Sequence, residues 1–220
     1  MIVANSLGEG RVFYSPDPLE FHPGSPDIYK GFLNFSGVTR ILIQPDDPSI
    51  RVFRLPTATE ETVYVFFNES KEEKRVALVI GTETITLSIG AGKPGLIKTM
   101  SSGEVSALES QGESTIGTTA LMDTDCHVMI ASLDDQGIDE SKSLMVLPIE
   151  PGHVRIATRI DWKNPVVGVG EMRSGKWHRL DSIEAKLSDG YLDFHINHLQ
   201  SLNVLLIAEE DWLDKLAENL

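Results

Sequence analysis

Between Arg40 and Ala208 the sequence is a succession of short apolar runs, and this pattern restricts the chain to a mainly β fold. The runs are rich in Val, Ile, Leu and Phe, and Gly, Pro, Asp and Asn separate them. Turn signals recur roughly every 8–12 residues, which is typical of β-sandwiches. The expected strands are 40–44, 50–55, 62–68, 75–80, 84–89, 95–99, 105–109, 116–121, 127–133, 143–149, 154–159, 166–171, 178–187, 191–196 and 203–208. We therefore predict an all-β protein.

The run from Val128 to Glu150 gives the clearest local prediction. Two apolar stretches, 128–131 and 144–147, flank a polar segment that contains Asp134, Asp135 and Gly137. Because Asp and Gly tolerate the backbone angles of tight turns, the pattern predicts a strand, a turned loop and a second strand.

Helices are expected only near the two ends. After Gly24, either Ser25 or Asp27 can cap a short helix that Gly37 ends, with Ile28, Phe32 and Phe35 facing inward. At the C-terminal end, acidic residues 209–211 favour a helix N-terminus. An apolar stripe follows at helical spacing: Trp212, Leu213, Leu216 and Leu220. We expect this stripe to pack on a sheet; the alternative is a helix that binds a partner.

The predicted domains are a segment 1–38, a first β-sandwich unit 39–100 and a second unit 101–220 that ends in the C-terminal helix. Periodicity also allows the two β-blocks to be halves of one sandwich. Within the first segment, Gly8 and Gly10 lack the third glycine or the Gly-Lys-Ser/Thr of a phosphate loop, and a strand pattern follows them. A tight hairpin turn is therefore expected there.

Charge and cysteine content restrict the partners. The formal net charge of −14 disfavours nucleic acid and anionic lipid. The longest apolar runs, such as 204–208, are too short to span a bilayer, so no membrane partner is expected. Cys126 is the only cysteine, which excludes an intramolecular disulfide and favours a reducing cytoplasm without excluding secretion. Asp123 and Asp125 beside it would raise its thiol pKa, so we expect a packing role.

Three stretches resemble parts of known glycoside hydrolases. The run SLDDQGIDESKSLMVLPI, 132–149, resembles SLDGKPIAESKRLLL in the C-terminal β-domains of certain glycosidases, and 63–68 resembles their "vyvflN" strand. The opening LGEGRVFYSPDPLE with IYKGFLNFSGV is similar to the end of the amidotransferase-like α/β domain of family 42 β-galactosidases. Asp135, Gln136 and Ser143 depart from the family pattern, at positions expected in a turn or at the surface.

The resemblance implies a non-catalytic C-terminal region of a glycosidase-like protein. Residues 1–38 would be the remnant of an α/β domain, or a cap. The family's catalytic (β/α)₈ barrel needs about 250 residues by itself, so it would lie outside this chain. The implied partners are that barrel or further copies of the chain. The alternatives are an autonomous carbohydrate-binding module, or an enzyme with a clustered, water-shielded carboxylate pair.

We find no catalytic or metal-binding motif, and we expect no cofactor. His195 and His198 stand at i and i+3, so on a strand their rings point apart, and HExxH is absent. On that strand Tyr191, Asp193 and His195 should form the outer face, with Leu192, Phe194 and Ile196 in the core. The acidic loop 134–140 lacks the EF-hand spacing, and no GxSxG is present. A looser calcium site in that loop stays open.

Two tryptophans with polar neighbours are the candidate carbohydrate site. Asp161-Trp162 and Trp177-His178 each place a large ring among groups that could bind sugar hydroxyls. A binding module requires these rings to be exposed. The competing interpretation, which we favour, is that both tryptophans close the ends of the sandwich, because large aromatics dominate cores.

Overall fold

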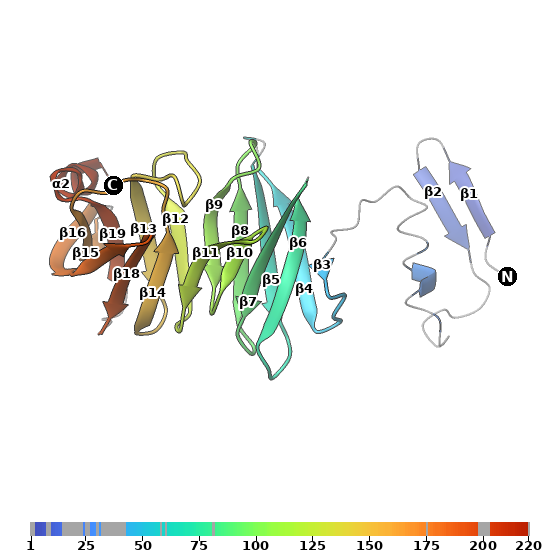
Figure 1. Cartoon of the computed structure of the whole chain (residues 1–220). Helices are drawn as coiled ribbons and strands as arrows, with labels where there is room; N and C mark the ends of the chain where they lie inside the picture. Colours follow the sequence, from blue (N-terminus) through green and yellow to red (C-terminus); the bar gives the residue numbers. More distant parts are fainter. Residues whose placement is uncertain are drawn as a thin grey trace. The chain divides into compact units, whose positions relative to one another are not determined.

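The computed structural model describes residues 3–7, 10–14, 24, 27–29, 31, 43–57, 59, 61–80, 82–174, 176–197 and 203–219 (Figure 1). The chain forms two compact units, Met1–Leu42 and Ile43–Leu220. In the first unit, β1 (Val3–Leu7) and β2 (Gly10–Tyr14) form an antiparallel hairpin with Leu7 opposite Gly10, which confirms the tight turn. Residues 27–29 and 31 are helical, and Phe32, Phe35 and Gly37 of the expected helix lie outside the described residues.

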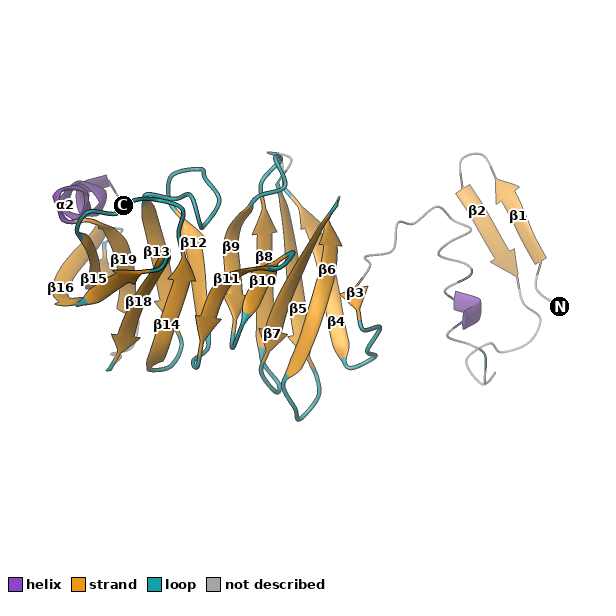
Figure 2. Cartoon of the chain, viewed as in Figure 1, coloured by secondary structure: helices purple, strands orange, loops and turns teal. Residues whose placement is uncertain are grey.

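The second unit contains two antiparallel sheets stacked in two layers (Figures 1 and 2). The eight-stranded sheet has the order β17 (Ala185–Ser188), β18 (Tyr191–Ile196), β14 (Gly152–Ala157), β11 (Thr119–Thr124), β10 (Ser114–Ile116), β7 (Glu83–Ile89), β6 (Lys74–Ile80) and β3 (Ile43–Gln44). The nine-stranded sheet has the order β16 (Lys176–Ile183), β15 (Pro165–Arg173), β19 (Asn203–Glu209), β13 (Ser143–Pro148), β12 (Val128–Ser132), β9 (Val105–Ser110), β8 (Pro94–Thr99), β5 (Thr62–Asn68) and β4 (Ile50–Pro56). The all-β prediction is confirmed, and the arrangement is that of a β-sandwich.

The sheets continue on both sides of residue 100. In the nine-stranded sheet β8 pairs with β9, and in the eight-stranded sheet β7 pairs with β10. The division into units 39–100 and 101–220 stays a prediction, because pairing across the boundary does not measure how the two parts fold.

Most expected strands are present, but two of the predictions were wrong, and both errors change the topology. The expected strand 116–121 is a hairpin, because Gly117 takes a positive φ of 57° and Ile116 pairs with Thr119. The expected strand 178–187 is divided between the sheets, with β16 in one and β17 in the other. The predicted hairpin at 128–150 is confirmed, since β12 pairs with β13 along its whole length, and Asp135 in its loop has a φ of 55°. Ser143, expected at the surface, is buried.

Alternation along the strands directs every second side chain into the core between the sheets. In β5, Tyr64, Phe66 and Asn68 are buried, and the residues between them face outward. Hydrogen bonds also join the layers, because Ser110 Oγ of β9 donates to the carbonyl oxygen of Ser88 in β7 at 2.7 Å.

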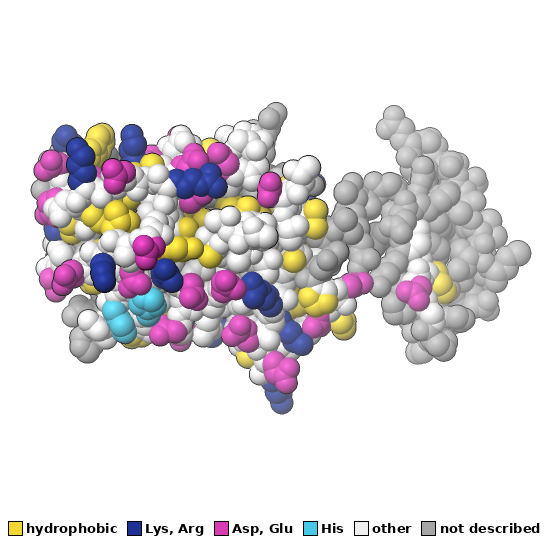
Figure 3. Space-filling view, in the orientation of Figure 1, with side chains coloured by type: hydrophobic (Ala, Val, Ile, Leu, Met, Phe, Trp, Pro, Cys, Tyr) yellow, Lys and Arg dark blue, Asp and Glu magenta, His cyan; other side chains and the backbone are white. Residues whose placement is uncertain are grey.

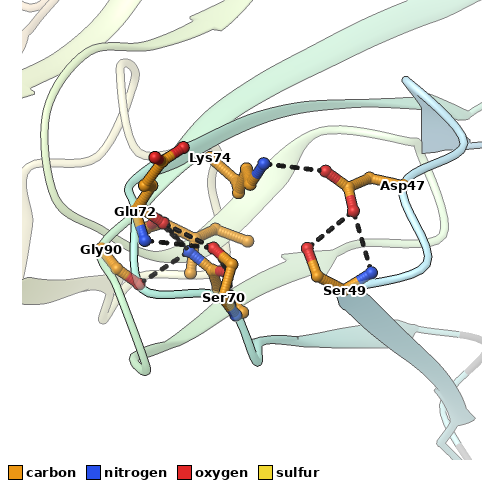
Figure 4. Close-up of polar contacts among 8 residues, drawn as sticks. Asp47, Ser49, Ser70, Glu72, Lys74 and Gly90 are labelled. Atoms are coloured by element: carbon orange, nitrogen blue, oxygen red, sulfur yellow. Dashed lines mark hydrogen bonds and ion pairs between the residues drawn. The ribbon is translucent and has the colours of Figure 1, made fainter.

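Asn68 makes a second polar connection between the sheets. Its Nδ2 donates to the carbonyl oxygens of Glu72 at 2.7 Å, Ile89 at 3.0 Å and Gly90 at 3.1 Å. Its Oδ1 accepts hydrogen bonds from Ser70, from the backbone N at 2.9 Å and from Oγ at 2.6 Å (Figure 4). Asn68 is only 2% exposed, and its hydrogen bonds to Ile89 and Gly90 are buried, so its amide satisfies carbonyl groups that have little access to water.

The C-terminal helix α2 (Glu210–Asn219) contacts β15, β16 and β19. Leu213 is fully buried, as expected for a stripe that packs on a sheet, but Trp212 is exposed, so including it in that stripe was wrong. Trp212 precedes Leu213 by one position, which rotates its side chain about 100° away on a helix. No helix in the described part of the chain is long and apolar enough to cross a membrane.

Candidate functional site

The loop between β14 and β15 holds the first predicted sugar-binding pair. Trp162 is only 4% exposed, and its Nε1 donates to Thr158 Oγ1 at 2.9 Å. Asp161, the preceding residue, is exposed. Trp162 therefore closes the core at this point, and only its polar neighbour faces solvent.

Strand β16 holds the second pair, and two glycines of the neighbouring strand make room for its ring. Trp177 is 3% exposed, and its Nε1 donates to the carbonyl oxygen of Val204 at 3.0 Å. A Cβ at Gly170 would lie 2.5 Å from Trp177 Nε1, and one at Gly168 would lie 2.9 Å from Trp177 Cη2. His178, next along the strand, is exposed. Strand alternation thus turns the ring inward and the imidazole outward.

The two pairs do not form a sugar-stacking platform. A platform needs an exposed ring face, and both rings are buried. The burial of Trp162 and Trp177 supports the packing interpretation, and a carbohydrate site at these residues stays an untested prediction. Asp161 and His178 are left as isolated polar groups on different segments.

A row of charged residues that alternate in sign crosses four strands on the outer face of the eight-stranded sheet. Asp123, Arg155, Asp193 and Lys186 stand directly opposite one another in turn across β11, β14, β18 and β17. Opposite charges on facing strands stabilise a sheet, so this row has a structural explanation. Arg155 also lies over the Tyr191 ring, 4.0 Å from its centroid, and covers an aromatic face that could otherwise stack on a ligand.

Histidines lie beside this row, and Figure 3 shows them in cyan among charged side chains. His153 Nε2 is 2.9 Å from Asp193 Oδ1, and the rings of His153 and His195 are 6.5 Å apart. Tyr191, Asp193 and His195 do form the outer face of β18, as the alternation predicted. Among the described residues, no cluster of three or more His, Cys, Asp or Glu side chains could hold a metal ion.

The acidic loop 134–140 uses its carboxylates within the protein. Asp134 accepts hydrogen bonds from Ser132 Oγ at 2.9 Å and from the backbone N of Lys142 at 2.7 Å. Asp139 and Glu140 pair with Arg159 at 3.0 Å and 3.1 Å. Asp134, Asp139 and Glu140 therefore each have a partner within the protein, and their arrangement can be explained without a bound metal ion.

Two carboxylates have lowered pKa values: Asp47, between β3 and β4, and Glu61, just before β5. Hydrogen bonds from the Ser49 side chain and backbone, together with Lys74, lower the pKa of Asp47 to about 2. Hydrogen bonds from Lys98 and then Thr59 lower the pKa of Glu61. A general acid needs a raised pKa, so neither group suits that role. Figure 4 shows Asp47 between Ser49 and Lys74.

Cys126 is also unsuited to nucleophilic catalysis. Its side chain is buried, and burial raises the pKa of its thiol. Gly152 passes so close that a Cβ there would lie 2.9 Å from the sulfur. A reactive cysteine needs access and a lowered pKa, whereas this one fills the core as the sequence predicted.

Three exposed apolar residues lie together on the outer face of β4 and β5, while others, such as Ile149, Met172 and Trp212, lie elsewhere. Phe53, Leu55 and Phe67 are 51%, 53% and 45% exposed, and the Phe53 and Phe67 rings meet edge to face with centroids 6.2 Å apart. The register places Phe53 opposite Val65, and Leu55 opposite Val63. We call Phe53, Leu55, Val63, Val65 and Phe67 the β4–β5 patch.

A cleft of about 490 Å³ opens where strands of the two sheets end, near β7, β9, β10 and β11. In Figure 3, apolar side chains show between acidic and basic ones over this region. The lining combines buried Ile85, Val105 and Leu121 with the charged groups of Glu83 and Glu104 and with the paired Arg159.

Neither the patch nor the cleft was predicted from the sequence. The patch does have a signal, because residues 63–67 are apolar at every position, as in a strand covered on both faces. The cleft has no such signal, since its residues come from five separate stretches of the chain: 80–85, 101–105, 116–121, 139–140 and Arg159.

Comparisons of the chain with known protein families, with curated proteins and with solved structures found no match.

Proposed function

We propose that this chain is a non-catalytic β-sandwich region of a glycosidase-like protein and supports a catalytic barrel that lies outside it. The observation that carries the proposal is the β4–β5 patch, which we assign as the surface that docks on the barrel. The resemblance of 132–149 and 63–68 to glycosidase β-domains supplies the identity of the partner.

The patch has the properties of a docking surface. Phe53 and Phe67 are about half exposed on a regular sheet face, where they bring large rigid rings to the surface. Aromatic side chains dominate the binding energy of protein interfaces, and removing apolar area from water favours association. Arg51, paired with Glu69 at 3.2 Å, provides a polar rim on the same strand pair.

Burial of the two tryptophans weakens the rival proposal of a carbohydrate-binding module. That proposal predicts binding of polysaccharide that depends on Trp162 and Trp177. Because both rings are buried, we expect substitution of either ring to destabilise the sandwich, with no separate loss of a binding site.

The first test measures the native polypeptide in source cells with an antibody against this chain. We expect a band several-fold larger than the 24.2 kDa of the chain, or a stable complex with a barrel-bearing protein. A free 24.2 kDa polypeptide without such a partner contradicts the proposal. Polysaccharide binding or release of reducing sugar by the isolated chain would favour the rival module or an enzyme, respectively.

The second test asks whether the β4–β5 patch is the docking surface in the native protein. Phe53→Ser combined with Phe67→Ser should loosen the docked region, with faster proteolysis and a lower Tm of the whole protein. The matched control is Ile149→Ser with Met172→Ser, which removes apolar groups of similar exposure, 56% and 47%, outside the patch. Equal effects of the two double variants would contradict docking through the patch.

A further inference from the structure

The β4–β5 patch is one end of an apolar surface that crosses most of the nine-stranded sheet. Residues that stand directly opposite each other on paired strands point to the same face of a sheet. The register therefore places one row on the outer face: Phe53, Val65, Leu96, Glu109, Met129 and Leu147. A second row runs beside it, from Leu55 and Val63 through Lys98, Ala107 and Ala131 to Met145.

Helix α2 packs on the other end of the same face. Met145 stands opposite Leu206 of β19, and Leu206 stands opposite Gly168 of β15. A Cβ at Gly168 would lie 2.8 Å from Leu213 Cδ2, so Leu213 of the helix lies on this face of the sheet. Leu206 is fully buried, whereas Met145, next to it on β13, is only half-buried. The helix therefore covers the face at β15 and β19 but leaves it open from β13 onward.

The few charges on the open part are paired within the chain. Lys98 and Glu109 are the only charged members of the two rows. Lys98 Nζ lies 2.9 Å from Glu61 Oε1, and Glu109 Oε1 lies 3.0 Å from His127 Nε2. A partner can cover these groups without supplying opposite charges of its own, so the face suits an apolar and uncharged surface.

The open part is wide enough for more than one further element. It includes the half-buried side chains of Leu96, Met129 and Leu147 and the half-exposed Phe53 and Leu55. Five spacings of about 4.8 Å separate β13 from β4 in the sheet order, so the width is about 24 Å. Packed helices lie about 8–10 Å apart, which leaves room for about two helices beside α2.

We propose that amphipathic helices from outside this chain cover the face from β13 to β4 and continue the helical layer that α2 begins. The chain itself supports this choice of element, because it covers the same face with a helix at β15 and β19. A second copy of the chain is disfavoured, since each copy carries a net charge of −14. This inference rests on the proposed function, in which the helices belong to the barrel, and it extends the docking surface from two strands to six.

Methionine oxidation tests how far the cover extends. Dilute hydrogen peroxide is applied to the isolated chain and to the native protein, and peptide mass spectrometry gives the rate at each methionine. We expect Met129 and Met145 to react in the isolated chain and several-fold more slowly in the native protein. Met172, which is 47% exposed on β15, on the other side of β19, should react equally in both samples.

Photo-cross-linking tests which element provides the cover. Leu147→p-benzoylphenylalanine places a cross-linker on β13, in the open part of the face next to the strand that α2 covers. We expect the cross-linked residues of the partner to be spaced three or four apart, because these positions share one side of a helix. Cross-linked positions two apart, as on a strand, or cross-links to a second copy of this chain would overturn the proposal.

A pair of variants tests the energetic contribution. Met129→Ser combined with Met145→Ser should speed limited proteolysis of the native protein several-fold. Thermal melting of the isolated double variant checks that it folds, which we expect because both side chains lie on the outer face. Ile149→Ser with Met172→Ser is the matched control, and equal acceleration by the two pairs would overturn the proposal.

The oxidation result separates this inference from the proposed function on which it rests. If Phe53 and Phe67 are protected in the native protein while Met129 and Met145 are not, the wider helical layer is refuted and docking through the β4–β5 patch stands. If none of the four side chains is protected, both proposals fail.

Discussion

Replacing Asn68 by Asp should destabilise the sandwich far more than its small change in shape suggests. The new side chain keeps an oxygen that can accept the hydrogen bonds of Ser70, at 2.9 Å and 2.6 Å. It loses the amide that donates to the carbonyl oxygens of Glu72, Ile89 and Gly90. At neutral pH it also places a carboxylate next to three carbonyl oxygens at a site that is 2% exposed.

The magnitude follows from the contacts that are lost. An amide has two protons, so its donors supply about two net hydrogen bonds, worth about 2 kcal/mol together. Leaving buried carbonyl groups without a donor costs about 1–3 kcal/mol more. We therefore expect the free energy of unfolding to fall by about 3–5 kcal/mol, which corresponds to a Tm decrease of about 10 °C for a chain of this size.

Urea denaturation of wild type and Asn68→Asp, followed by far-UV circular dichroism, measures the change. Ser70→Ala is the control, because it keeps the Asn68 amide and removes only the Ser70 hydroxyl, which donates to Asn68 Oδ1 and hydrogen-bonds the exposed backbone of Glu72, and it should cost about 1 kcal/mol. If Asn68→Asp were no less stable than Ser70→Ala, the connection between the sheets through the amide would not contribute as we argue.

Three further predictions concern packing, pH and exposure. Gly170→Ala should lower stability by about 2 kcal/mol or more in chemical denaturation, because the added carbon would lie 2.6 Å from the carbonyl oxygen of His178. Gly31→Ala, where the added carbon meets nothing within 4 Å, is its control, and equal stability of the two variants would refute the argument. The pKa of Asp47 is lowered to about 2, so its contribution is present above the unfolded-state pKa, about 3.9, and is lost as pH falls toward 2. The stability difference between wild type and Asp47→Asn should therefore shrink over that pH range, and a constant difference would speak against the contribution. Acrylamide should quench mainly Trp212, which is 58% exposed while Trp162 and Trp177 are buried, so Trp212→Phe should remove most of the accessible fluorescence. Substantial quenching left in that variant would contradict the burial of the other two rings.

Local chemistry made several features of the fold predictable. The β12–β13 hairpin follows from two short apolar runs that flank a polar segment with Asp135, which adopts the positive φ that Asp tolerates. The missed hairpin at Gly117 shows the limit of this approach. Thr118 and Thr119 continue the β-branched pattern and favour a continuous strand, so only Gly117 indicated a turn at this place.

Features that depend on distant parts of the chain could not be predicted in this way. Trp177 is buried because Gly168 and Gly170 on the neighbouring strand leave room for its ring, a pairing that spacing along the chain does not show. The cleft is likewise made by Glu83, Glu104 and Arg159 from separate segments. The β4–β5 patch differs from the cleft: we did not predict it, but the apolar run 63–67 contains a local signal for it, because a strand with two apolar faces is one that is covered on both sides.

Hydroxyl-radical footprinting of the native protein, compared with the isolated chain, tests most directly whether the β4–β5 patch is a docking surface. Our account predicts that Phe53, Leu55 and Phe67 are labelled in the isolated chain and protected in the native protein, while the labelling of exposed Ile149 stays the same. Equal labelling of the three patch residues in both samples would contradict the proposed docking on a catalytic barrel.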